Sequence, residues 1–544
     1  MNENNSEIST ISNYGILFRN SFYSFLKTYG TFIFSLLSTI LIARIINDVN
    51  WSYFIIALSY IMIISIILNF VPPSIRDTIS YFIPRYLSLQ KNNELKRFIL
   101  RSILVKTIFV IIIFIISSLI FTYFSEIFAI NLPVNILGIL VLLSPLIIIN
   151  NIQIILNGIN MGFNKFKWAF LVVIIQYSIY IGLLLFYFVA FKSIELDTLC
   201  IIYVLAALIP FLLNIIFVIF QIHKIKTDDR STHTFKHDVK EMVKYGGQVR
   251  AATFFNDIWG EIQVLSIGVF EPQMVMGFKI SRDLLSVSTN TAIASSYPLT
   301  VSFSSFIAKD EKDNIVAIYN LLIKYLIFLI ALITGILFFC TDLFIVLIYG
   351  EARVIYSGIV KLYLFTFIFL ILASPFDSLL LAEYKTKSLI YIKIIGLLIR
   401  LPLYLFLLIN FDLIHAIVGI IISNSIFSAL YLIITIKVGK IKLDLNKILF
   451  QYIAFFLSLI ITVILEFFIL DLINEVLFGG LLFAQHFNIF SLLTFLFVFM
   501  FLIINFKLLT TSDINYLQSF FISKKKMHKA TNLALNFLKK LLKD

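Results

Sequence analysis

Residues Tyr245–Phe306 read YGGQVRAATFFNDIWGEIQVLSIGVFEPQMVMGFKISRDLLSVSTNTAIASSYPLTVSFSSF. Two apolar segments of helix length meet there at a short break, Glu271-Pro272-Gln273, and both segments carry ionisable side chains. A charge at the centre of a bilayer costs at least about 2.5–3.5 kcal/mol, so it is tolerated only where it faces a bundle interior or a water-filled cavity. The stretch therefore predicts two membrane helices that line a polar space.

The charges of each segment fall on one helix face. Arg250, Asp257 and Glu261 are seven and four residues apart, which at about 100° per residue places them on the same side. The second segment has a similar face, made of Lys279, Arg282, Asp283, Ser286 and Asn290.

The composition predicts a polytopic membrane protein. The chain has 544 residues, of which 60% are hydrophobic and 13% charged, and its mean hydropathy is +1.00. No soluble core could use so much apolar surface, so we expect an all-α membrane bundle. The two cysteines and six histidines show no metal-ligand spacing, and we expect neither a metal nor a cofactor.

At about 20 apolar residues per span, the sequence predicts about fourteen transmembrane helices. They are expected at 22–46, 52–71, 98–124, 133–156, 168–191, 198–222, 246–270, 274–306, 316–349, 355–381, 386–410, 413–436, 447–471 and 477–506.

Basic residues concentrate in alternate loops, whereas the intervening loops hold mainly acidic residues or few charges. By the positive-inside rule, this alternation places both termini in the cytoplasm of a protein that crosses the plasma membrane many times. Met1–Asn13 lacks a basic n-region and a cleavage site, so we expect the first helix to direct insertion. The net charge of +13 indicates orientation and contact with membrane lipid, and we expect no binding to nucleic acid.

The longest polar interruption, 223–244, has mixed charge, and we interpret it as a cytoplasmic linker between two lobes. It separates an N-terminal lobe of six helices, 1–222, from a C-terminal lobe of six helices, 245–440. Both lobes start on the same side, and their fourth helices contain the pairs Ser144-Pro145 and Ser374-Pro375. This arrangement indicates a parallel repeat.

Two segments follow the predicted repeat. Residues 441–510 are expected to add two more helices. Residues 511–544 place leucine and lysine at helical spacing, which is typical of an amphipathic helix on the anionic cytoplasmic leaflet. A solvated basic tail is the alternative.

Pro72-Pro73 marks a break near the end of the second predicted helix. The segment that follows, 75–80, either extends that helix past the membrane or forms a broken helix that lines a cavity.

Several short patterns follow one family. The segment Ser38–Ile46 is similar to the "lLARlLG" ending of its first helix, with Asn47 where glycine is usual. Leu347–Glu351, followed by Tyr356, is similar to its "lfGeeY" turn. Leu380–Lys387 is similar to its "lLlAlGktk" loop, although glutamate and tyrosine depart from that pattern.

Two further stretches extend the likeness. Asp257 and the residues up to the turn at Glu271 look like the opening of the second lobe, and 410–419 looks like the start of the twelfth helix. Together the patterns cover most of residues 15–440. The chain resembles the polysaccharide and oligosaccharide flippase branch of the multidrug/oligosaccharidyl-lipid/polysaccharide exporter superfamily.

That resemblance implies two six-helix lobes around a central cavity that opens alternately to each side. It implies a transporter and not an enzyme, which moves a polyprenyl-phosphate- or diphosphate-linked oligosaccharide from the cytoplasmic to the outer leaflet. The implied partners are membrane lipid, the lipid-linked oligosaccharide and glycan-assembly enzymes, and we expect a monomer.

An anionic phosphate that crosses a membrane sheds water, which Arg replaces with forked hydrogen bonds and Lys with a compact charge. The candidate residues of a cationic cavity are Lys27, Arg76, Arg250, Lys279 and Arg282. Other interpretations stay open, because Lys27 and Arg250 could snorkel to the interface and Arg76 could anchor a lipid headgroup.

Asp257, Glu261 and Asp283 are the candidate acids, which either form structural bridges to cations or bind a coupling cation or proton. An ion-coupled small-molecule exporter of the same superfamily would need an acid-dominated cavity and an apolar pocket, whereas this chain, with a net charge of +13, has mixed and net basic helices. A membrane glycosyltransferase would need catalytic carboxylates in a large outer loop, and every predicted outer loop is short. A lipid scramblase without energy coupling stays open.

Overall fold

A computed structural model describes residues 23, 26–27, 29–123, 136–225, 235–308, 312–383, 385–437, 441–478 and 487–508. These residues are helical almost throughout and contain no β-strand. The predicted all-α class is confirmed. The predicted amphipathic tail, 511–544, lies outside the described residues.

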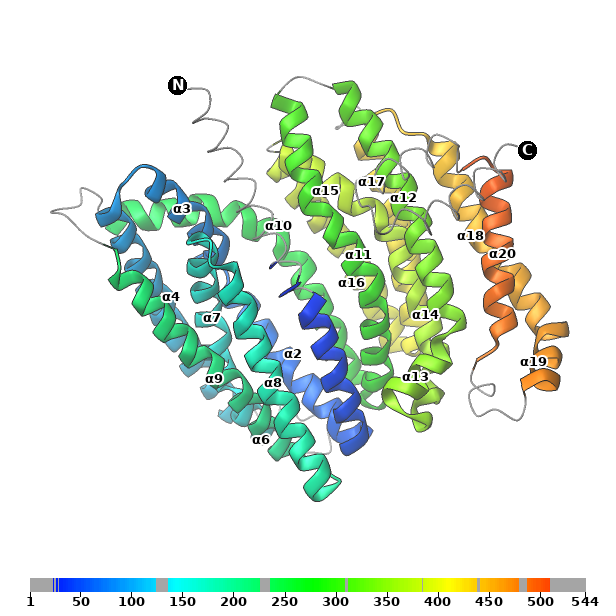
Figure 1. The fold of residues 1–544 in the computed structure, drawn as a ribbon, viewed down its shortest axis with the longest axis horizontal. Coiled ribbons are helices and arrows are strands. Elements are labelled where there is room, and N and C mark those ends of the chain that lie inside the picture. Colours follow the sequence, from blue (N-terminus) through cyan, green and yellow to red (C-terminus); the bar gives the residue numbers. More distant parts are fainter. Residues whose placement is uncertain are drawn as a thin grey trace, which may run out of the picture. The chain divides into compact units, whose positions relative to one another are not determined.

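Figure 1 shows the helices coloured along the sequence. In chain order they are α2 (Asp48–Leu68), α3 (Ile75–Ser88), α4 (Asn92–Tyr123), α6 (Ile136–Leu143), α7 (Pro145–Gly162), α8 (Phe166–Phe191), α9 (Leu196–His223), α10 (Phe235–Phe270), η1 (Pro272–Met274), α11 (Val275–Ala308), α12 (Lys312–Phe339), α13 (Thr341–Tyr349), η2 (Glu351–Tyr356), α14 (Ser357–Ile368), η3 (Phe369–Leu372), α15 (Ala373–Ala382), α16 (Thr386–Asn410), α17 (Leu413–Lys437), α18 (Leu445–Leu465), η4 (Glu466–Leu470), α19 (Asp471–Phe478) and α20 (Ile489–Asn505).

Within the described residues, ten helices are long and apolar enough to cross a membrane, and the helices Tyr29–Ile45 and Ile489–Asn505 are apolar but shorter. Helices α10 and α11 are not among the ten, and both carry the ionisable residues of the stretch quoted first. The predicted count of fourteen spans is therefore not confirmed. The predicted break at Glu271 is confirmed, because α10 ends at Phe270 and η1 separates it from α11.

The chain forms two compact units. Unit 1 comprises Met1–Lys279, Ile348–Gly350 and Thr386–Ala416, and unit 2 comprises Ile280–Leu347, Glu351–Lys385 and Ile417–Asp544. In unit 1, α3 packs on α7, and α10 packs on α2 and α16. In unit 2, α18 lies beside α20 and α12 (Figure 1). The predicted lobe boundaries stay a prediction; residues 235–244 of the predicted linker are the first turns of α10.

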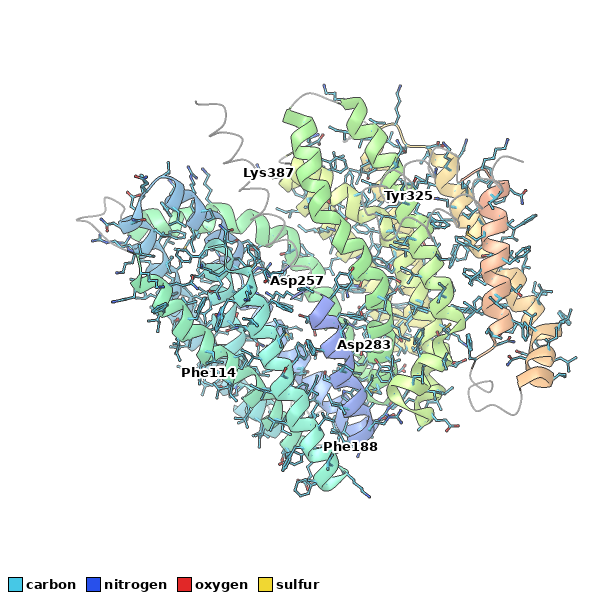
Figure 2. All side chains as sticks on the ribbon, in the orientation of Figure 1. Phe114, Phe188, Asp257, Asp283, Tyr325 and Lys387 are labelled. Carbon is cyan, nitrogen blue, oxygen red and sulfur yellow. The ribbon has the colours of Figure 1, made fainter. Side chains whose placement is uncertain are left out.

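Helices α4, α8 and α9 of unit 1 present many exposed apolar side chains on one surface. Phe188, on α8, is 40% exposed, and α9 exposes Ile216 and Ile219 to a greater extent. Figure 2 shows the side chains of α4 and α8 projecting from this side, with Phe114 and Phe188 labelled. Such continuous apolar exposure is expected of helices that face lipid rather than water.

Inside unit 1, a network of amides connects α7, α8 and α9. The Asn160 Nδ2 donates to Asn214 Oδ1 at 2.7 Å, and the Trp168 indole donates to the same oxygen at 3.1 Å. Gln221 Nε2 in turn donates to Asn160 Oδ1 at 2.8 Å. Asn160 and Asn214 are fully buried, so these bonds satisfy polar groups that lipid could not.

A tight turn separates α2 from α3. The backbone N–H groups of Phe70 and Val71 donate to carbonyls of the last turn of α2, and Ser74 has a left-handed φ of 41°. α3 is therefore a separate helix and not a continuation of α2. The predicted break is confirmed, whereas a cavity lined by 75–80 stays a prediction.

Helix α10 approaches this turn at a glycine. A Cβ built on Gly246 would lie 1.9 Å from the carbonyl oxygen of Pro73 and 2.7 Å from Thr78 Oγ1. The neighbouring Gly247 has nothing within 4 Å of the same position. Gly246 therefore lets the backbone of α10 contact the turn directly.

We expect Gly246→Ala to lower the thermal unfolding midpoint of the purified protein in detergent, because overpacking against backbone costs about 1–3 kcal/mol. Gly247→Ala is the matched control, and it should leave the midpoint unchanged or raise it, because alanine favours a helix over glycine by up to about 1 kcal/mol. Equal midpoints for the two variants would contradict the close approach at Gly246.

Candidate functional site

The C-terminal end of α2 is the centre of the candidate site. Aligned peptide dipoles give a helix a partial negative charge at this end, which cations stabilise. The last turn of α2 contains no basic residue of its own. Two cations from other helices of unit 1 bind it instead. Arg250 Nη2, from α10, donates to the Ile66 carbonyl at 3.0 Å, and Lys106 Nζ, from α4, donates to the Leu68 carbonyl at 2.5 Å.

Arg250 is 4% exposed, and several groups contact its two terminal nitrogens and its guanidinium face. Its Nη1 donates to Asp257 Oδ2 at 2.6 Å and lies 3.3 Å from Thr253 Oγ1. Its guanidinium carbon lies 5.3 Å from the ring centroid of Phe70 and 5.7 Å from that of Phe254. A carboxylate, a helix end and two aromatic faces thus stabilise one buried charge.

Asp257 differs from its partner in exposure. Its side chain is 44% exposed, whereas that of Arg250 is 5% exposed. Figure 2 shows Asp257 on α10. The predicted pairing of these two residues is therefore present as an ion pair with one accessible member. Water or a ligand can therefore reach the carboxylate, whereas the guanidinium is buried.

Lys106 was not among the residues predicted from the sequence. It is fully buried, and it lies close enough to Arg250 for electrostatic interaction. Its signal in the sequence is a lone cation within the apolar run SILVKTIFVIII of α4. An intramembrane cation is a functional-site candidate by default, so the rule that selected Lys27 could also have selected Lys106.

Two predicted cations lie elsewhere in unit 1. Arg76, in the first turn of α3, has a 54% exposed side chain that pairs with Asp77 at 3.1 Å. Lys27 is half-buried and lies close enough to Arg76 for electrostatic interaction. The backbone of Arg76 rests against α7, because a Cβ on Gly158 would lie 2.9 Å from its Cα. Four segments of unit 1 therefore contribute cations in two pairs of like charge, and each pair also contacts one carboxylate, Asp77 or Asp257. Anion binding by these cations stays a prediction.

The remaining candidates are half-buried and have interaction partners. Glu261 and Lys279 belong to unit 1, whereas Arg282 and Asp283 belong to unit 2. Within unit 2, Arg282 lies close enough to Tyr363 for electrostatic interaction. Figure 2 labels Asp283 on α11. A role for these four residues stays a prediction.

The turn between α10 and α11 is held within unit 1. The pKa of the Glu271 carboxyl is raised by burial, and a hydrogen bond from the Leu413 backbone offsets part of this rise. The neighbouring Asp412 has a lowered pKa, chiefly because the backbone N–H of His415 donates to it. These contacts attach the end of α10 to the start of α17. No group of three His, Cys, Asp or Glu residues in the described part of the chain could hold a metal.

Residues 17–279 match the model of a family described as "Polysaccharide biosynthesis protein". The predicted family resemblance is confirmed. The match runs from the first predicted helix to the start of α11 and includes Arg250 and Lys106. No curated protein matches the chain.

The fold is similar to solved membrane transporters. Lipid II flippase MurJ, in an inward closed conformation, gives a TM-score of 0.63 at 15% identity over 88% of this chain and 97% of that one. An inward-facing MATE multidrug resistance transporter of the MOP superfamily gives 0.60 at 12% identity over 75% and 95%. A MOP superfamily transporter from Pyrococcus furiosus gives 0.55 at 12% identity over 77% and 94%. At identities this low, the structural similarity establishes a shared fold and nothing further.

Replacing Lys106 by methionine keeps most of the side-chain volume but removes the donor to the Leu68 carbonyl. A hydrogen bond from a charged group contributes about 1.5–3 kcal/mol, so we expect Lys106→Met to lower the thermal unfolding midpoint in detergent. Lys96→Met, at a half-buried position of the same helix, is the control and should change it little. An unchanged midpoint for Lys106→Met would show that this contact does not stabilise the helix end.

Proposed function

We propose that this protein is a flippase that moves a polyprenyl-phosphate- or diphosphate-linked oligosaccharide from the cytoplasmic to the outer leaflet by alternating access, for cell-surface glycan assembly. The proposal places both termini in the cytoplasm of a plasma-membrane protein. The observation that supports it is the binding of Arg250 and Lys106 to the end of α2 inside an apolar bundle.

The partners of Arg250 are well suited to exchange with a phosphate. A helix end and a half-exposed carboxylate neutralise the guanidinium when no anion is bound. An anionic headgroup could replace one of these acceptors without leaving the arginine unsatisfied, because its five N–H donors form a fork that matches phosphate oxygens. Lys106 would keep the helix end neutralised during that exchange.

The family relation supports the class of substrate. The matched family is described by polysaccharide biosynthesis, and one structural neighbour is named as a lipid II flippase. The Pyrococcus furiosus neighbour is described as having a binding pocket of reverse polarity that suggests a different function. By analogy with that transporter, we take the charge of the site as the property that selects the substrate. The cations Lys27, Arg76, Arg250 and Lys106 of unit 1 then favour an anionic substrate.

An ion-coupled small-molecule exporter is the second candidate, because several structural neighbours are MATE transporters. For that function Asp257 and Glu261 would carry the coupling ion. The ion pair between Arg250 and Asp257 opposes this alternative, because a carboxylate that already balances a buried guanidinium binds a second cation less favourably.

Reconstitution in proteoliposomes tests the two functions. A fluorescent polyprenyl-diphosphate oligosaccharide and a cationic dye are scored side by side, and we expect only the glycolipid to move. Arg250→Ala should reduce glycolipid movement by at least about tenfold, the effect of losing one charge-assisted hydrogen bond of about 1.4 kcal/mol or more. Arg250→Lys should retain part of the activity, because it keeps the charge but loses the fork.

Lys447→Gln serves as the control, because Lys447 is 53% exposed and pairs only locally with Asp444 at 2.6 Å. Its transport should equal that of the unaltered protein. Dye efflux driven by a proton or sodium gradient, with no glycolipid movement, would contradict the flippase function and support the exporter function. Full glycolipid transport by a folded Arg250→Ala variant would remove Arg250 from the mechanism.

A further inference from the structure

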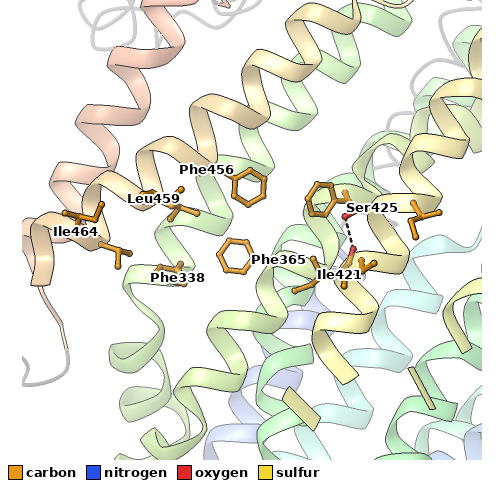
Figure 3. A pocket seen from close by; sticks show the side chains of 12 residues that line it. Phe338, Phe365, Ile421, Ser425, Phe456, Leu459 and Ile464 are labelled. Carbon is orange, nitrogen blue, oxygen red and sulfur yellow. Dashed lines mark hydrogen bonds between the residues drawn. The ribbon is translucent and has the colours of Figure 1, made fainter. Parts of the chain in front are cut away.

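An apolar groove opens on unit 2 between α14, α17 and α18 (Figure 3). Its volume is about 690 Å³. With one exception the lining residues are apolar, and they include Phe338, Ile421, Ile422, Ile460 and Ile464. Ser425 is the one polar residue of this lining, and its hydroxyl donates to the Ile421 carbonyl at 2.8 Å. The groove therefore suits a hydrocarbon chain and offers little to a polar ligand.

One end of the groove meets a charged cluster, which we define as Asp342, Lys361 and Glu466. The Lys361 ammonium lies 5.9 Å from the ring centroid of Phe338, a residue of the groove. Lys361 Nζ donates to Asp342 Oδ2 at 2.9 Å, and Ser357 Oγ donates to the other oxygen of the same carboxylate. Charge and hydrocarbon surface thus adjoin at a single position.

Glu466, the third member of the cluster, directly follows the C-terminal residue of α18. It follows Ile464 of the groove by two residues and lies close enough to Lys361 and Asp342 for electrostatic interaction. It begins the π-helical segment η4 (Glu466–Leu470), a kind of irregularity that is frequent at functional sites. The cluster therefore places one ammonium near two carboxylates and has a formal net charge of −1.

The cluster is accessible. The side chains of Lys361 and Asp342 are 31% and 27% exposed. On the walls of the groove, Ile422 and Ile460 are 48% and 55% exposed, so the groove is open along its side. A molecule that lies in the membrane could enter sideways, with its polar end at the cluster and its chain between α17 and α18.

We propose that this groove binds a membrane phospholipid whose headgroup joins a phosphate to a primary ammonium, as in phosphatidylethanolamine. An acyl chain fills the groove, the phosphate accepts from Lys361, and the ammonium donates to the Glu466 and Asp342 carboxylates. By the predicted topology, the lipid belongs to the outer leaflet. The charge complementarity selects this occupant, because an anionic headgroup without an ammonium would add a negative charge to a cluster whose net charge is already −1.

The site does not depend on the transport substrate proposed above. Its cations and acids are distinct from Arg250 and Lys106, which belong to unit 1. Lipid binding can therefore be measured without transport, and either proposal can fail alone.

Native mass spectrometry of the detergent-purified protein tests the assignment. The protein is incubated with phosphatidylethanolamine or with phosphatidylglycerol of the same acyl chains, and the retained lipid is counted. We expect about tenfold preferential retention of phosphatidylethanolamine, the effect of about 1.4 kcal/mol from a hydrogen bond to a charged group. Glu466→Gln should remove the preference, and Lys361→Gln should weaken retention of both lipids.

Two tryptophan variants distinguish lipid binding in the groove from lipid binding elsewhere on the surface. Ile422→Trp would fill the groove and abolish preferential retention. Ile433→Trp is its control, because both isoleucines lie on α17, both are 48% exposed, and only Ile422 lines the groove. A thermal unfolding midpoint equal to that of the unaltered protein verifies folding of each variant, so a loss of lipid is not a loss of structure.

Three results would overturn the proposal. Equal retention of the two phospholipids would show that the cluster does not discriminate between their headgroups. Full preference in Ile422→Trp would place the lipid elsewhere. Displacement of phosphatidylethanolamine by an equimolar amount of polyprenyl phosphate would assign the groove to the prenyl chain of an anionic lipid.

Discussion

The structure of unit 1 depends on how the C-terminal end of α2 is neutralised. The turn after α2 supplies N–H donors to its last carbonyls, but the dipole of the helix still ends in an apolar bundle, where water cannot screen it. Arg250 and Lys106 provide the positive charge from two other helices. In this way two buried cations, each unfavourable alone, and a helix end, also unfavourable alone, stabilise one another.

This arrangement explains the placement of the surrounding elements. Helix α10 packs along α2, which brings Arg250 within hydrogen-bond distance of the Ile66 carbonyl. Gly246 contacts Pro73, so the backbone of α10 lies directly against the turn. Because Lys106 has to reach Leu68, α4 also passes the same point. Any anion that binds Arg250 must therefore compete with a structural role of that residue, which ties occupancy of the site to the geometry of α2 and α3.

Sequence patterns pointed to Arg250, Asp257 and the break at Pro72-Pro73, but not to the backbone carbonyls that the cations bind. The spacing of Arg250 and Asp257 predicted a shared face, and the structure shows their ion pair. The Pro72-Pro73 pair predicted a break, because proline lacks the N–H that a helix needs. Lys106 has a different kind of partner, the Leu68 carbonyl, and a backbone acceptor on another helix leaves no signature in a sequence. The count of fourteen spans stays a prediction, because the charges of α10 and α11 lower the hydropathy by which spans are recognised.

The amide network of α7, α8 and α9 bears on how the chain enters the membrane. Asn160 and Asn214 are separated by 54 residues, so the amide of α7 has no partner until α9 has been synthesised and inserted. At about 5–20 residues per second, several seconds separate the two events. During that interval a polar helix lacks its final hydrogen bonds, and an insertase or chaperone that shelters it from lipid would have to retain it until α9 arrives.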